Sequence, residues 1–79
     1  MNKERRKQIA TAVELLEQAA VILEECYEAE QEYYDNMPES LQQGDKGQTA
    51  EDAAIALSEA KDACEAAVEQ AQAASGGGW

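Results

Sequence analysis

The sequence predicts an all-α fold: an antiparallel two-helix hairpin, copies of which assemble into a homo-oligomeric bundle, most simply of four helices. Apolar residues recur at spacings of three, four and seven over residues 9–34 and 50–74, as they do on one side of an α-helix. Pro38, Gly44 and Gly47 interrupt the pattern between these stretches. A chain of 79 residues forms one domain that buries little surface alone, so self-association is the expected way to cover the rest.

Composition restricts the function. Seventeen Asp and Glu against six Lys and Arg give a net charge of -11, which repels nucleic acid and anionic membranes and suits a basic protein partner. The apolar runs are far shorter than the roughly twenty residues of a membrane span, so we expect a cytoplasmic protein. With two Cys and no His, neither a metal site nor a cofactor is expected.

The first helix is expected over residues 3–35, with Asn2 as its N-cap. Leu15 and Ile22 widen its apolar side, and a side this broad contacts two neighbouring helices rather than one. The glutamates on the other side are expected to be solvated. The residues expected in the core or in the oligomer contact are Ile9, Val13, Leu16, Leu23 and Cys26.

Lys3, Arg5, Arg6 and Lys7 form a basic cluster at the start of this helix. They are four of the six basic residues, and cations are unfavourable there because the helix macrodipole is already positive. One interpretation is a solvated end, or a salt-bridge partner for an acidic stretch of a neighbouring subunit. The other is a site for a small anionic ligand, since the planar fork of arginine can grip phosphate with two hydrogen bonds.

Tyr27, Tyr33 and Tyr34 lie towards the end of the first helix. An apolar ring with a polar tip suits the rim of a core or of an interface, which is one interpretation of these residues. Stacking on the base of a bound nucleotide is the other. Together with the basic cluster, the three tyrosines are the candidate ligand-binding residues.

A loop is expected over residues 36–48, because Pro38 disfavours helical geometry at Met37 and cannot donate a backbone hydrogen bond. Pro38 could open a single helical turn that reaches Leu41. Met37 and Leu41 would then close the open end of the core. Gly44 and Gly47 are expected to make the remainder of the loop flexible.

The second helix is expected over residues 49–74, where Thr49 and Asp52 form a near capping box. It is rich in alanine, which favours the helix and leaves room for larger residues of the first helix. Residues 75–79 look like a flexible tail added for measuring concentration and are excluded from the fold. The expected core residues of the second helix are Leu57, Cys64 and Val68.

Pairing the two helices about the loop places Cys26 opposite Ser58 and Cys64 opposite Ala20. The thiols are then about 9 Å apart along the axis, too far for an unstrained disulfide. Both cysteines are therefore interpreted as small buried hydrophobes. The same register leaves the basic cluster projecting beyond the second helix.

The motif YDNMPESLQ at residues 34–42, with KERRK at residues 3–7 before it and Gly44 and Gly47 after it, resembles small uncharacterised phage and prophage proteins of Gram-positive bacteria. The resemblance covers nearly the whole chain except the tail. It implies a helical hairpin and a phage context, and hence the cytoplasm of a host bacterial cell. It implies no particular activity and identifies no binding residues in this chain.

Catalysis is not expected, because His is absent and no nucleophile–base pair is recognisable. We expect a non-catalytic binding protein that sequesters or blocks a host factor, such as an anti-phage defence factor. In one mechanism the basic cluster holds an anionic nucleotide signal. Alternatively, acidic faces that include Glu24, Glu25 and Glu28 bind a basic host protein in place of DNA, or the chain is a structural assembly or adaptor protein of the phage.

Overall fold

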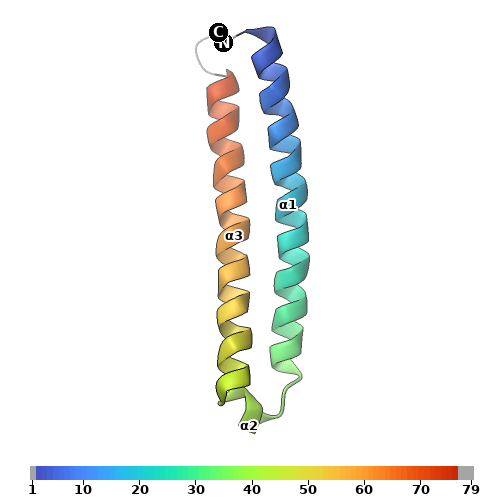
Figure 1. Cartoon of the computed structure of the whole chain (residues 1–79), viewed down its shortest axis with the longest axis vertical. Coiled ribbons are helices and arrows are strands. Elements are labelled where there is room, and N and C mark those ends of the chain that lie inside the picture. The colour runs from blue at the N-terminus through green and yellow to red at the C-terminus, as the bar shows by residue number, and fades with distance from the viewer. Residues whose placement is uncertain (1, 77–79) are drawn as a thin grey trace.

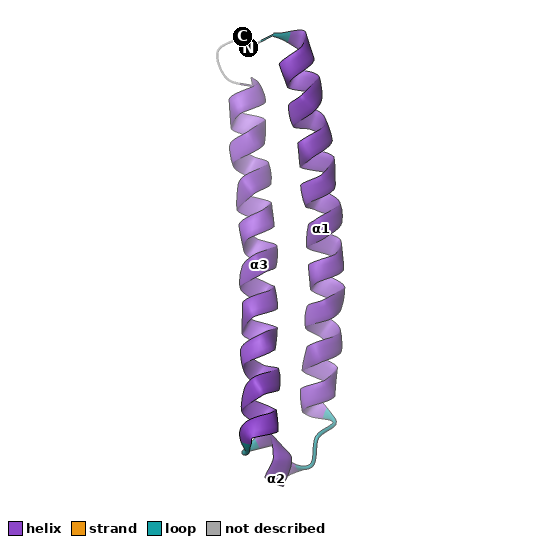
Figure 2. Cartoon of the chain, in the orientation of Figure 1, coloured by secondary structure: helices purple, strands orange, loops and turns teal. Residues whose placement is uncertain are grey.

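Two long helices lie side by side and run in opposite directions in the computed structural model, which describes residues 2–76 (Figure 1). The first, α1, spans Lys3–Asp35, and the second, α3, spans Asp45–Gly76. A one-turn helix, α2, spans Glu39–Gln42 and lies at the end where α1 and α3 are joined. Every regular element between residues 2 and 76 is helical, which confirms the all-α class (Figure 2).

The start of α1 is fixed by the Asn2 cap expected from the sequence. The Asn2 side-chain oxygen Oδ1 accepts a hydrogen bond of 2.7 Å from the backbone N–H of Arg5, which would otherwise lack a partner in the first turn. The helix ends where the backbone N–H of Met37 donates to the carbonyl of Tyr34 at 3.1 Å. Pro38 follows and prevents the helix from continuing.

The segment between the long helices is held by Met37 and Gln42. Met37 is buried, with 9% of its surface exposed. The Gln42 side-chain amide donates to the backbone carbonyl of Tyr34 at 2.9 Å, which ties α2 to the last turn of α1. Leu41 is 43% exposed, so the expectation that it closes the core with Met37 is wrong for Leu41. The Tyr34 carbonyl thus accepts hydrogen bonds from both Met37 and Gln42, whereas Leu41 stays exposed.

The second long helix begins at Asp45, four residues before the expected Thr49, so the predicted loop is too long. Gly47 is buried within α3, where a Cβ atom would collide with the backbone of Gln42. The absence of a side chain at Gly47 therefore allows α2 to approach α3; the residue does not make this segment flexible. Thr49 lies inside the helix and caps nothing, while Asp52 accepts a hydrogen bond of 2.9 Å from Gln48 Nε2.

The far end of α3 extends to Gly76, beyond the expected last residue 74. Ser75 and Gly76 are helical, and so the predicted tail begins too early. Residues 77–79 of that tail lie outside the described residues. No helix in residues 2–76 is both long enough and apolar enough to cross a membrane.

The core between the helices is thin. Among the described residues, the buried hydrophobic side chains are Met37, Ala50 and Ala54. Cys26 is exposed in the single chain, because it lies to one side of the contact between the helices, so it is no part of the core of the helix pair. Its burial in an oligomer contact stays a prediction. Neither cysteine forms a disulfide. The expected core residues that are half-buried are Ile9, Val13, Leu16, Leu23, Leu57, Cys64 and Val68.

Candidate interaction faces

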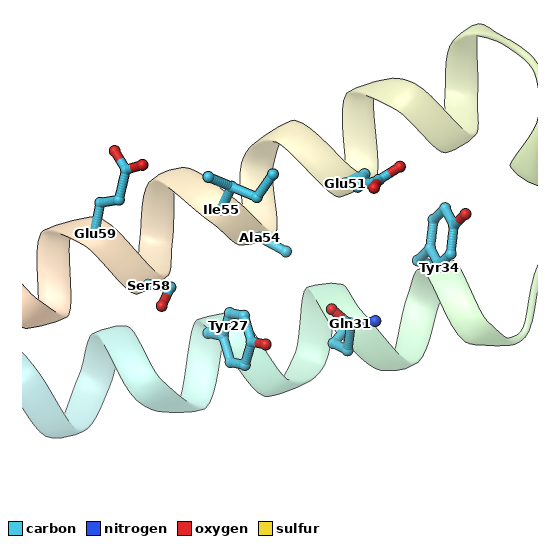
Figure 3. A pocket seen from close by; sticks show the side chains of 8 residues that line it. All are labelled: Tyr27, Gln31, Tyr34, Glu51, Ala54, Ile55, Ser58 and Glu59. Carbon is cyan, nitrogen blue, oxygen red and sulfur yellow. The ribbon is translucent and has the colours of Figure 1, made fainter.

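One groove runs between α1 and α3 near the connecting segment. It has a volume of about 440 Å³, and Tyr27, Gln31 and Tyr34 line it from α1. Figure 3 shows Ala54 and Ser58 of α3 facing these side chains. The remaining lining residues on α3 are Glu51, Ile55 and Glu59. The groove therefore combines two tyrosine rings with carboxylates at its rim.

A second groove, of about 350 Å³, lies further along the same two helices. Its lining contains four carboxylates and one ammonium group. Lys61 Nζ lies 3.0 Å from Glu24 Oε2 and 3.6 Å from Glu65 Oε1. The hydrogen bond and the charge of Glu24 raise the pKa of Lys61 above its usual value. The four carboxylates are Glu24, Glu25, Glu28 and Glu65.

These grooves open on one side of the helix pair. Glu51, Ser58, Glu65 and Gln72 are spaced by seven residues, so they lie on the same side of α3. Each of them lines one of three grooves that follow one another along the molecule. We call this side the carboxylate face and define it by Glu24, Glu25, Glu28, Glu51, Glu59 and Glu65.

The opposite side has a different character. Tyr33 and Thr49 line a separate groove there with Glu30, Asp45 and other residues. Leu15 and Ile22, which are 60% and 58% exposed, are seven residues apart, and Cys26 follows Ile22 after four residues. These spacings place all three on that side of α1. Val21, which is 59% exposed, lines a groove of the carboxylate face instead. Val21 and Ile22, which are adjacent and almost equally exposed, thus lie on opposite sides of the helix pair.

The candidate ligand-binding residues are not gathered within one chain. The basic cluster lies in the first two turns of α1 and beyond the end of α3, because Ile9 shares a groove with Ser75 and α3 ends at Gly76. Tyr27 is twenty residues further along from Lys7, about 30 Å at 1.5 Å per residue. Tyr34 shares a groove with Tyr27, whereas exposed Tyr33 lies on the other side.

Sequence reasoning missed Lys61, which pairs with Glu24 across the helices. The spacing of Lys61 and Glu65 by four residues is a readable signal for a pair within the helix. The contact with Glu24 requires the register of the two helices. That register follows the predicted one, since Cys26 opposite Ser58 also implies Glu24 close to Lys61.

The described residues contain no group of three or more Cys, Asp or Glu side chains that could hold a metal ion. Comparison with known proteins found no matching family model, no matching curated protein and no matching solved structure. The resemblance to phage and prophage proteins therefore stays a prediction. The geometry that bears on function is the separation of the carboxylate face from the side of α1 that exposes Leu15 and Ile22.

Proposed function

We propose that this chain is a non-catalytic binding protein that self-associates as a helical hairpin bundle and captures a basic partner on its carboxylate face. The observation that carries the proposal is the arrangement of that face. Six carboxylates line two successive grooves, and one lysine, Lys61, is placed among them. Carboxylates arranged along a groove attract and orient cationic side chains before contact is made.

The tyrosines give the groove a second means of recognition. Tyr27 and Tyr34 present half-buried rings along the same groove as Glu51 and Glu59. An arginine or lysine side chain can pack its cation against such a ring while the carboxylate holds its charge. A basic segment in extended or helical form is therefore the kind of ligand that this face fits.

The test uses a fluorescent deca-arginine peptide as the probe and measures its anisotropy at physiological salt. Replacing Glu28, Glu51 and Glu65 by Gln removes three charges from the carboxylate face. We expect affinity to fall about tenfold, because exposed charge contacts contribute a few tenths to 1 kcal/mol each.

The matched control replaces Glu4, Glu30 and Glu39 by Gln, which changes the net charge equally but elsewhere. We expect less than about a twofold loss of affinity. An equal loss for the two triple variants would mean that only net charge matters and would overturn the proposal.

The basic cluster supports a second candidate, in which the oligomer sequesters a small anion such as a nucleotide. Four cationic residues lie within two turns at one end of the molecule, and α1 begins there with its positive macrodipole. Titration with ATP should then show binding that Arg5→Ala and Arg6→Ala abolish while the oligomer stays intact. Lys46→Ala at the other end of the molecule is the control. Absence of ATP binding by the unmodified chain would overturn this candidate.

The setting of either activity rests on the sequence resemblance. A phage origin, a cytoplasmic host target and an anti-defence role belong to the proposal on that ground. A structural adaptor in phage assembly would instead bind a phage protein and no nucleotide. We expect such an adaptor to bind neither the deca-arginine peptide nor ATP, so these two probes separate the outcomes.

A further inference from the structure

Each long helix carries a second row of small or apolar side chains beside the row that it uses in the helix pair. On α1 the second row advances by alternating steps of three and four residues, which is the spacing of a coiled-coil seam. The α3 row has the same spacing, and neither row contains a charged residue between its ends. The row on α1 includes Ala12, Leu15, Ala19, Ile22, Cys26 and Tyr33, and the row on α3 includes Thr49, Ala53, Ala56, Ala60, Ala63 and Ala67.

The two second rows lie on the same side of the molecule. Tyr33 from one row and Thr49 from the other line a common groove, opposite the carboxylate face. The helices run side by side over their whole length, so the rows continue next to each other from that groove onward (Figure 1). Together the two rows form one strip, which we call the apolar face; its charged neighbours Glu30, Asp45 and Lys46 line the groove near the connecting segment.

The exposed area of the chain exceeds that of a compact protein of its mass by about the area that one partner contributes to an interface. A folded protein of 8.6 kDa exposes about 4,700 Å², whereas this chain exposes 5691 Å². The excess of about 1,000 Å² is close to the roughly 800 Å² that each partner contributes to a standard protein interface. Its radius of gyration of 17.7 Å also exceeds the roughly 12 Å of a compact chain of this length.

We infer that a second copy of this chain covers the apolar face, with the two copies related by a two-fold axis parallel to the helices. In this arrangement the α1 row of each copy packs against the α3 row of the other. The inference rests on the proposed self-association and adds its surface and its symmetry. The surface is specific, since the other face is acidic and two such faces repel.

The side chains of the two rows decide the orientation of the axis. Leu15, Ile22 and Tyr33 are large, whereas the α3 row is almost entirely alanine. Large side chains that face small ones interdigitate, so both pairs of facing helices lie at the same separation. A two-fold axis perpendicular to the helices would instead place the α1 rows on each other and the alanine rows on each other. The helix separations would then be unequal, near 10 Å at one contact and 8 Å at the other.

The parallel axis has a consequence for the ends of the assembly. Both connecting segments lie at one end, and both basic clusters lie at the other. The pairing thus places the four cationic residues of one copy at the same end as the four of the other. A small anion, the ligand of the second candidate function, would then meet eight cationic groups instead of four. A perpendicular axis would separate them by the length of the molecule.

Distance measurement between spin labels tests the arrangement. The labelled chain carries Cys26→Ala and Cys64→Ala, and Glu39→Cys in α2 holds one nitroxide. We expect a label-to-label distance below about 30 Å, because the helices of adjacent layers lie about 10 Å apart. A dimer with a distance of about 50 Å, the length of α1, would overturn the parallel axis and leave self-association standing. A monomer in sedimentation would overturn both.

A pair of adjacent substitutions tests the surface independently. Ile22→Glu places a carboxylate on the apolar face, and we expect it to weaken the dimer about 100-fold or more, because burying an unpaired charge is costly. Val21→Glu has the same helical context and equal native exposure but faces the other side, and we expect it to leave the dimer unchanged. Equal effects of the two substitutions, or none from Ile22→Glu, would overturn the assignment of this face.

Discussion

Lys61 Nζ lies 3.0 Å from Glu24 Oε2 and thereby joins the middle of α3 to the middle of α1. Both side chains are partly exposed, so the pair adds little to the attraction between the helices. It does distinguish one register from its neighbours, because a shift of one turn, about 5.4 Å, would separate the two charges. The weakly packed core gives few other constraints of this kind.

Lys61→Met should therefore lower the denaturation midpoint, and a double-mutant cycle should assign more coupling to Glu24 than to Glu65, which is further away. The pKa of Lys61 is raised in the folded chain, so the stabilisation is fully present below the ordinary value of 10.5 and is lost as pH rises through the folded value. The stability difference between the native chain and Lys61→Met should thus shrink above pH 10.5. A difference that grows with pH would contradict the pairing.

Gly47→Ala should destabilise the chain by at least about 2 kcal/mol in urea unfolding, because its Cβ would meet the backbone of Gln42, which cannot rotate away. Helix propensity alone predicts the opposite sign, a gain of about 1 kcal/mol. Gly44→Ala is the control, since its Cβ would lie 3.6 Å from the Ser40 carbonyl oxygen, an ordinary contact. Equal stability of the two variants would show that α2 does not pack on α3 as described.

Met37→Ala should cost about 2 kcal/mol, since Met37 is the large buried side chain at the connecting end. Leu41→Ala should cost less than about 0.5 kcal/mol, because Leu41 is 43% exposed. Thermal unfolding followed by circular dichroism measures both. A larger loss for Leu41 than for Met37 would restore the original expectation that Leu41 closes the core.

Asn2→Ala should cost about 1 kcal/mol, because the N–H of Arg5 loses the side-chain acceptor that caps α1. Asn2→Asp should retain most of the stability, since aspartate is an equally good cap. Amide hydrogen exchange in the first turn is the direct measurement. Unchanged protection in Asn2→Ala would mean that the cap does not hold the basic end of α1.

The helices and their register follow from sequence because they depend on repeating apolar positions and on local signals such as Asn2 and Pro38. The start of α3 does not follow from sequence. A glycine at position 47 predicts a flexible loop, and only the close approach of the Gln42 backbone explains it within a helix. Leu41 fails for the same reason, since its exposure depends on how the single turn of α2 is oriented.

The candidate site was predictable to a lesser degree. Clustering of Lys3 to Lys7 is visible in the sequence, but its separation from Tyr27 by twenty residues of straight helix excludes a joint site within one chain. The opposite placement of Val21 and Ile22 is implicit in helical spacing, yet it acquires meaning only when the position of the second helix is known.

Sedimentation equilibrium of the full chain at micromolar concentration tests the central claim most directly. Self-association through the apolar face predicts a helical particle of about twice the chain mass of 8.6 kDa. A well-folded helical particle of 8.6 kDa at the same concentration would contradict it.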